Sequence, residues 1–244
     1  KRQIFDTMAT KKILDVLGLN VSFEKNKQKT TVVHDIAFSL YENEILAIVG
    51  ESGSGKSLTS KAIMGLLSDK HTRIKGHINF EETSLLSLSS KEFAKLRGND
   101  IAMIFQEPMS ALNPSLTCGF QVAEILLHHK KVAATQVKKE VLQLFEKVKL
   151  PRPQDMYTSY PHQISGGQMQ RVVIAMAIAC KPKLLIADEP TTALDVTVQK
   201  EILQLLKDLQ KQTGMSMLFI SHDLALVCEL ADRVMVMYKG DIVE

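Results

Sequence analysis

The sequence predicts an α/β fold in which a largely parallel β-sheet is joined by an antiparallel β layer and an inserted group of helices. Three features lead to this prediction. First, a glycine-rich stretch, residues 50–57, lies between an apolar run and a helical pattern. Second, three later apolar runs each end in polar residues. Third, a helical stretch bounded by prolines separates two of these runs. Short apolar runs that alternate with helices are typical of α/β proteins.

The composition fits a globular chain with one large domain or two small lobes. The 244 residues are 45% hydrophobic and 23% charged, and the net charge of +3 comes without a dense block of Lys and Arg, so we expect no nucleic-acid partner. The longest apolar run, residues 172–180, is shorter than the ~20 residues that cross a bilayer, and without a secretory signal we expect a cytosolic protein. Cys118, Cys180 and Cys228 are far apart, so we expect three small core residues in a reducing compartment.

The glycine-rich stretch has the properties of a phosphate-binding loop. After an apolar run at residues 45–49 and before a helical pattern at residues 58–67, it reads Gly50-Glu51-Ser52-Gly53-Ser54-Gly55-Lys56-Ser57. Glycines reach backbone conformations in which successive N–H groups turn toward one anion, and the helix that follows adds its own free N–H groups. Lys56 can reach the outer phosphates, and the Ser57 hydroxyl can ligate Mg²⁺. The alternative is a Gly/Ser-rich surface loop.

Three β-leaning runs lie on either side of this loop in the sequence. Residues 13–23 and 31–40 flank a polar turn, and residues 74–80 follow the helix of the loop. The loose alternation of apolar and polar residues predicts an antiparallel layer beside the core. Phe23 ends the first run and can stack on an adenine ring, although a single aromatic residue is also typical of a core.

A helical lobe is expected between two strands of the core. Residues 101–105 form an apolar run that predicts a buried strand, and Gln106 follows it, where α/β sheets place ligand-binding side chains. Helical patterns cover residues 120–129 and 135–148, and a loop continues to Gln163. Connections of this length are usually functional.

A second helix start resembles an anion site. Ser165 is a good N-cap, and Gly166 and Gly167 leave backbone N–H groups accessible before Gln168 in a helix that continues to about Cys180. The alternative is a flexible helix cap with no ligand.

Two adjacent carboxylates follow the next apolar run, residues 184–187. Asp188 and Glu189 are costly side by side unless a cation or a catalytic role compensates. Asp188 suits Mg²⁺ ligation, and Glu189 suits polarising a water molecule.

The rest of the chain predicts one more helix, one more strand and a hairpin. Residues 191–195 form a tight loop before an amphipathic helix at residues 196–210. Residues 215–220 form another apolar run, and His222 follows it, either as a site residue or as a buried histidine with satisfied partners. Residues 233–244 predict a terminal hairpin.

The order of these features resembles the nucleotide-binding domain of ABC transporters over residues 12–244. The motifs that carry the resemblance are Walker A (residues 50–57), the Q-loop (Gln106), the signature (Ile164 to Gln168), Walker B (Leu184 to Glu189), the D-loop (Ala193, Leu194 and Asp195) and the H-loop (His222). The resemblance implies a P-loop NTPase core with an antiparallel β subdomain at residues 12–106 and 164–244, a helical subdomain at residues 107–163 and an N-terminal tail at residues 1–11. The signature begins with Ile164 where the family usually has Leu, an apolar exchange.

The resemblance also implies a role for each motif. The expected ATP-binding residues are Phe23, Gly50, Glu51, Ser52, Gly53, Ser54, Gly55, Lys56, Ser57 and Leu58. Ser57, Gln106 and Asp188 would hold Mg²⁺. Glu189 would activate water, with His222, Gln106 and Lys56 completing the catalytic set. Ser165, Gly166, Gly167, Gln168 and Asp195 would contact ATP held by a second chain.

A narrower resemblance, to the ATPases of oligopeptide, dipeptide and nickel importers, is carried by residues 103–114, 160–163 and 191–199. This implies an ATP-hydrolysing subunit that powers peptide uptake, as a homodimer or as a heterodimer with a paralogous ATPase. Two integral-membrane permease subunits and, indirectly, an extracytoplasmic solute-binding protein would be its partners, on the cytoplasmic face of the membrane. Those ATPases commonly carry a C-terminal extension that this sequence lacks.

Other functions remain open at this point. The same motor could serve an importer of nickel or another small solute. A non-transport ABC ATPase would carry long coiled coils or two cassettes, and no sustained heptads lie between Lys56 and Ser165. A small-molecule kinase would need the phosphate loop but neither the signature nor a dimer.

Overall fold

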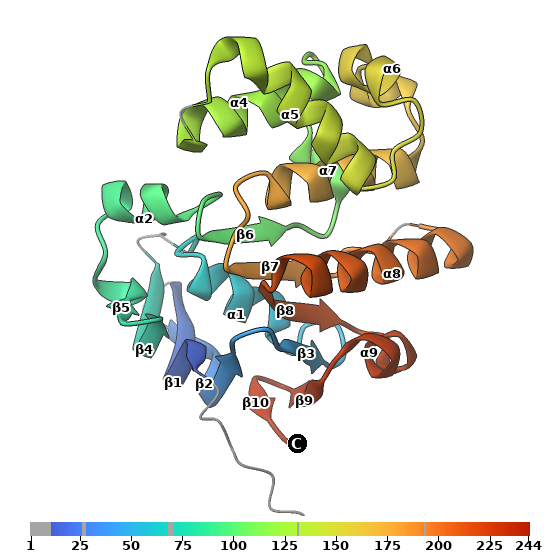
Figure 1. The fold of residues 1–244 in the computed structure, drawn as a ribbon. Coiled ribbons are helices and arrows are strands. Elements are labelled where there is room, and N and C mark those ends of the chain that lie inside the picture. The colour runs from blue at the N-terminus through green and yellow to red at the C-terminus, as the bar shows by residue number, and fades with distance from the viewer. Residues whose placement is uncertain (1–10, 26–27, 68–70, 131, 193) are drawn as a thin grey trace, which may run out of the picture.

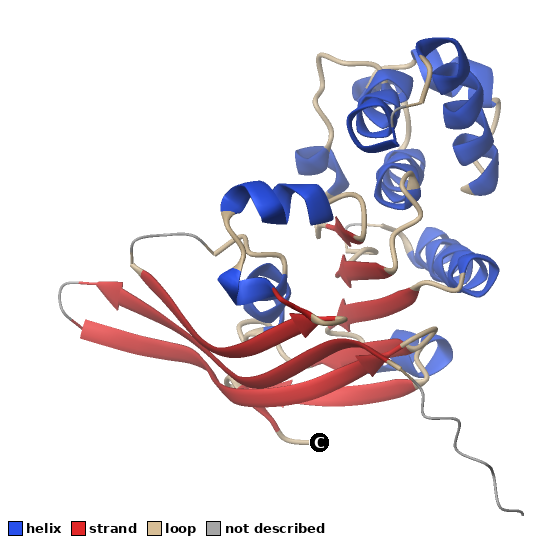
Figure 2. Ribbon diagram, turned by 60° about the vertical axis from the view of Figure 1, so that its left-hand side comes forward, coloured by secondary structure: helices blue, strands red, loops and turns tan. Residues whose placement is uncertain are grey.

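The computed structural model of the protein describes residues 11–25, 28–67, 71–130, 132–192 and 194–244. Ten of the eleven residues of the expected N-terminal tail, and Ala193 of the expected D-loop, lie outside the described residues. The described chain forms two β-sheets, and the helices between residues 118 and 178 lie above them (Figure 1). Figure 2 shows the long antiparallel strands on one side and most of the helices at the other end.

The strands are β1 (Lys12–Lys25), β2 (Gln28–Tyr41), β3 (Ile45–Val49), β4 (Thr72–Phe80), β5 (Thr83–Ser84), β6 (Ile101–Ile104), β7 (Leu184–Asp188), β8 (Ser216–Ser221), β9 (Arg233–Tyr238) and β10 (Asp241–Ile242). The helices are α1 (Lys56–Ile63), α2 (Ser90–Leu96), α3 (Pro108–Ala111), α4 (Cys118–Lys130), α5 (Ala134–Lys147), α6 (Pro153–Thr158), α7 (Gly166–Ile178), α8 (Val196–Thr213) and α9 (Leu224–Leu230).

The two sheets have the expected characters. The larger sheet has the order β10-β9-β3-β8-β7-β6, and all its pairs are parallel except the terminal pair of β9 and β10. The smaller sheet, β2-β1-β4-β5, is entirely antiparallel. The α/β core with an antiparallel layer is therefore confirmed.

The core strands are apolar along their whole length because both faces of the larger sheet are covered. In β3, Leu46 and Ile48 enter the cluster shared with the smaller sheet and α1, whereas Ile45, Ala47 and Val49 enter the cluster shared with α4, α5, α7 and α8. A strand covered on both faces shows a continuous apolar run instead of alternation. This explains why the sequence reveals these strands so clearly.

The expected helices at residues 120–129 and 135–148 are α4 and α5, which pack on α6 and α7. The stretch expected to be a loop contains α6, which begins at Pro153 after Arg152 in a left-handed conformation. Proline suits the first turn of a helix because its missing N–H would have no partner there. Short helices such as α2, capped by Ser89 and Glu92, and α9, capped by Asp223, were also not expected.

Several element bounds differ from the prediction by one to a few residues, and two of the elements concerned border the ligand-binding edge of the sheet. Helix α1 begins at Lys56, directly after Gly55, and ends at Ile63 because Gly65 takes a left-handed conformation. Strand β6 ends at Ile104, and the side chain of Phe105, expected to be buried, is 40% exposed. The backbone leaves the sheet one residue before the apolar run ends.

No helix among the described residues has both the length and the apolar character that a bilayer-spanning helix requires.

The cysteines do not all lie in the core. Cys118 and Cys180 are buried, as expected, but Cys228 is exposed. The buried residues of α9 are Val227 and Leu230, which lie on one face of the helix. Cys228 lies on another face and is therefore exposed. Burial raises the pKa of the Cys118 thiol to about 11.

Thiol alkylation at pH 8 tests this arrangement. We expect rapid labelling of Cys228 in the native protein. Labelling of Cys118 should be at least about 100-fold slower, because its thiolate fraction is small and its sulfur is buried. The C228S variant should take up label only after denaturation. Fast labelling of the native C228S protein would contradict the burial of the other two thiols.

Candidate functional site

The loop between β3 and α1 is shaped by glycines. A Cβ atom added to Gly50 would lie 2.0 Å from the carbonyl oxygen of Met237 in β9, so only glycine allows this close packing. Gly53 and Gly55 have φ values of +81° and +105°, which other residues rarely adopt. Among the described residues, neither the Gly53 N–H nor the Gly55 N–H donates a backbone hydrogen bond. Together with the free N–H groups at the start of α1, they form a cradle for an anion.

Lys56 adds a buried positive charge to this cradle. Its side-chain Nζ donates to the carbonyl oxygens of Gly50 at 2.7 Å and Glu51 at 2.9 Å. Burial lowers the pKa of the Lys56 ammonium, and the charges of Glu189 and Asp188 partly oppose that shift. The loop therefore holds a cation against its own backbone, next to the donors that face the anion site.

Asp188 ends β7 and is almost fully buried beside the first turn of α1. Its carboxylate accepts from the Ser57 hydroxyl at 2.9 Å and from the Ser60 hydroxyl at 3.1 Å. Burial raises the pKa of the Asp188 carboxyl, and the two hydroxyl donors oppose this only in part. Ser60 was not predicted as a site residue, although its spacing of three from Ser57 places both on one face of the helix.

The oxygen atoms at this point suit a magnesium ion. Ser57, Gln106 and Asp188 line a common cavity of about 200 Å³. A hydroxyl, an amide and a carboxylate are hard oxygen ligands of the kind that Mg²⁺ prefers. The residues present therefore fit this ion.

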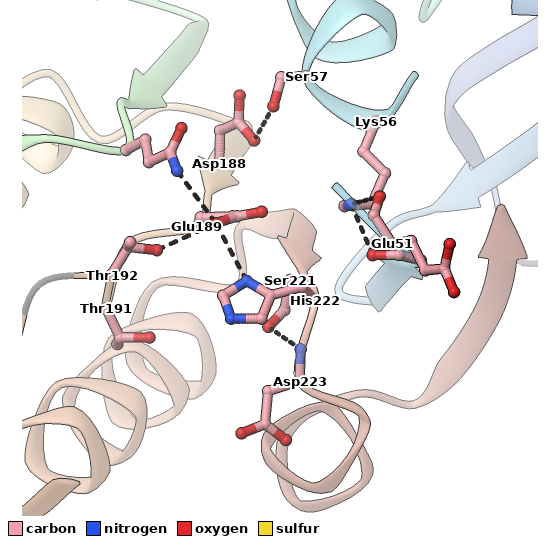
Figure 3. A network of polar contacts seen from close by, with 12 residues as sticks. Glu51, Lys56, Ser57, Asp188, Glu189, Thr191, Thr192, Ser221, His222 and Asp223 are labelled. Atoms are coloured by element: carbon pink, nitrogen blue, oxygen red, sulfur yellow. Dashed lines mark hydrogen bonds and ion pairs between the residues drawn. The ribbon is translucent and has the colours of Figure 1, made fainter. Parts of the chain in front are cut away.

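Glu189 lies at the centre of a polar network (Figure 3). Its Oε2 atom lies 3.2 Å from the Gln106 amide nitrogen, 3.1 Å from the Thr192 hydroxyl and 3.2 Å from His222 Nδ1. Its backbone has a φ of +47°, and its N–H donates to the carbonyl of Ile220. Thr192 was not predicted in this network. The one feature of the sequence that could have indicated it is its position three residues after Glu189, with Pro190 between them.

Strand register explains why distant residues meet here. Asp188 pairs with Ile220 in β8, and Val49 of β3 pairs with Ser221 of the same strand. The residues that follow these strand ends are the phosphate loop, Glu189 and His222. The carboxyl ends of parallel strands meet at one edge of the sheet, which is where α/β folds bind ligands.

The signature residues lie apart from this network. Ser165 caps α7: its hydroxyl accepts from the Gln168 N–H, and its own N–H donates to the Oε1 atom of Gln168. A Cβ atom on Gly167 would lie 2.8 Å from Val198 of α8, and Asp195 caps that helix through the Val198 N–H. Among the described residues, no hydrogen bond joins the signature or Asp195 to the phosphate loop.

Phe23 and Leu58 are half-buried and pack against the cluster between the two sheets. Phe23 lies near the end of β1, opposite Thr72 of β4. Adenine stacking by Phe23 stays a prediction.

Comparison with known proteins places this geometry in context. A family model described as ABC transporter matches residues 33–192. The chain is 51% identical to the dipeptide transport ATP-binding protein DppD of Bacillus subtilis (strain 168), covering 96% of this chain and 70% of that protein. It is 50% identical to the oligopeptide transport ATP-binding protein OppD of the same strain, over 96% of this chain and 65% of that protein. A dimeric, post-hydrolysis structure of the ATP-binding cassette MJ0796 bound to ADP and Pi matches with a TM-score of 0.84 at 26% identity, over 95% of this chain and 97% of that one.

The close packing of the loop on β9 can be tested by adding one methyl group. We expect Gly50→Ala to lower the free energy of unfolding by about 1–3 kcal/mol, because its Cβ atom overlaps a backbone oxygen that cannot rotate away. Gly166→Ala is the matched control, since its Cβ atom would meet only Leu194 at an ordinary 3.6 Å. Urea unfolding of both variants measures the difference, and equal stability would contradict the described contact.

Proposed function

The chain belongs to the ABC transporter family, and from this we propose that it is the ATP-hydrolysing subunit of an importer of dipeptides or oligopeptides. One observation carries the proposal: three neighbouring side chains hold the carboxylate of Glu189 next to the anion cradle and to the cavity lined by Ser57, Gln106 and Asp188. The identity of about 50% to transport proteins for dipeptides and oligopeptides supports the choice of cargo.

The phosphate loop, residues 50–57, would bind the phosphates of ATP through its N–H groups and Lys56. Phe23 would stack on the adenine ring, and the N–H of Leu58 would add to the helix start. Ser57, Asp188 and Gln106 would hold Mg²⁺. When bound, this ion supplies positive charge that offsets the charge developing on the phosphate oxygens.

Glu189 would act as the general base. Its Oε2 atom is occupied by three neighbours, whereas its Oε1 atom has no hydrogen-bond partner among the described residues. Oε1 is therefore the atom that can accept a proton from an attacking water molecule. His222 and Gln106 would keep the carboxylate in place, and Lys56 would stabilise the negative charge of the transition state.

The complete site would need a second chain. Ser165, Gly166, Gly167, Gln168 and Asp195 would contact ATP bound to the phosphate loop of a partner, either another copy or a paralogous ATPase. Two facts support this: the signature makes no hydrogen bond to its own phosphate loop among the described residues, and the matching MJ0796 cassette is described as dimeric.

Residues 107–163 would form the subdomain that docks on a membrane permease, one of the two permease subunits of the complex, at the cytoplasmic face. A largely apolar cavity of about 630 Å³ lies between this segment and the core, lined in part by Leu66, Phe105, Ile125 and Met176. It shares Phe105 and Ser110 with the cavity at Ser57. A permease segment bound there would contact the chain directly next to Gln106.

Replacing the proposed base tests the catalytic role. We expect Glu189→Gln to lower ATP turnover by about 10²–10⁴-fold while ATP binding is retained, because the amide keeps the shape but cannot take a proton. Phosphate release and nucleotide binding are the measurements. Glu140→Gln, an exposed site on α5, is the matched control and should turn over ATP like the wild type.

Wild-type turnover in Glu189→Gln would remove Glu189 from the role of base. Phosphate transfer that requires an added acceptor would favour a kinase instead. Stimulation of the assembled transporter by peptides, and not by nickel, would support peptide cargo.

Substitution at the signature tests the two-chain site. We expect Ser165→Arg, in the Glu189→Gln background, to abolish dimer formation with Mg-ATP. Nucleotide binding by the monomer should be unchanged, since Ser165 is exposed and makes no hydrogen bond to its own phosphate loop among the described residues. Light scattering reports the dimer. Ser90→Arg, at the exposed start of α2, is the control. An unchanged dimer in the Ser165 variant would contradict the cross-chain assignment.

A further inference from the structure

The Thr192 hydroxyl holds the Glu189 carboxylate from the loop that leads into α8. The distance from Thr192 Oγ1 to Glu189 Oε2 is 3.1 Å (Figure 3). The Thr192 N–H also donates to the carbonyl of Glu189 at 3.2 Å. The same residue therefore fixes both the backbone and the side chain of the proposed base.

We propose that Thr192 is a positioning residue that keeps Glu189 Oε2 engaged and directs Oε1 to the attacking water; this inference rests on the proposed function. A hydroxyl can donate one hydrogen bond in a single direction. Thr192 gives that bond to Oε2, so rotation of the carboxylate away from this arrangement breaks it.

Thr192 is suited to this role because its side chain has little freedom. Threonine is branched at Cβ and has only one torsion angle between heavy atoms, χ1. The other two partners of Glu189 are less constrained: Gln106 is exposed and has a long side chain, and the His222 side chain is 59% exposed. Of the three contacts to Glu189, the one from Thr192 therefore costs the least side-chain conformational entropy when it forms.

Thr191 and Leu194, which lie on either side of Thr192 in the sequence, are held by α8. The Gln199 amide nitrogen donates to the carbonyl oxygens of Thr191 and Leu194, both at 3.1 Å. Asp195 caps the same helix. The hydroxyl of Thr192 thus links Glu189 to the end of α8 that carries Asp195, a residue proposed to meet the partner chain.

Steady-state ATPase measurements on the full chain test the inference. We expect Thr192→Val, which keeps the shape and loses the hydroxyl, to lower kcat roughly 10- to 100-fold with KM and ATP affinity unchanged. Thr192→Ser keeps the hydroxyl and should stay within about threefold of the wild type. Thr191→Val is the matched control, because the Thr191 hydroxyl makes no hydrogen bond among the described residues.

The same substitution in the Glu189→Gln background shows whether Thr192 acts through the base. We expect Thr192→Val to cause no further loss there, since a residue that only positions Glu189 has nothing left to position. Normal kcat in Thr192→Val, or an equal loss in both backgrounds, would overturn the inference. If Glu189→Gln still lowers turnover, the proposed function survives either outcome.

Discussion

The site depends on keeping two adjacent carboxylates, Asp188 and Glu189, next to the phosphate cradle. Such a pair is costly, because like charges repel and burial disfavours the charged form. The structure compensates each carboxylate from a different side: serine hydroxyls from α1 donate to Asp188, and three neighbours surround one oxygen of Glu189. Lys56 adds a positive charge nearby. The strands and helices around the pair supply these donors.

The parallel sheet supplies them by register. Strands β3, β7 and β8 are neighbours, and their carboxyl ends place the phosphate loop, the carboxylate pair and His222 at one edge. The two apolar clusters on either face of the sheet hold this edge in position. The buried parallel strands therefore bring together site residues that are far apart in the sequence.

The sequence revealed features whose cause is local. The phosphate loop needs glycine at Gly53 and Gly55 because of their positive φ values, and buried strands show as continuous apolar runs. It did not reveal features that depend on tertiary contacts. The hydrogen bonds of Ser60 and Thr192 require a particular pairing of strand and helix ends, short helices such as α6 and α9 have too few residues to show a period, and the outward face of Cys228 depends on how α9 packs.

The central claim is that each nucleotide is held by the phosphate loop of one chain and the signature of another. A structure of the Glu189→Gln protein with Mg-ATP tests it most directly. The account predicts a dimer in which Ser165 of one chain contacts the terminal phosphate of ATP bound at Lys56 of the other. Bound ATP whose terminal phosphate touches only a single chain, in every assembly obtained, would contradict the account.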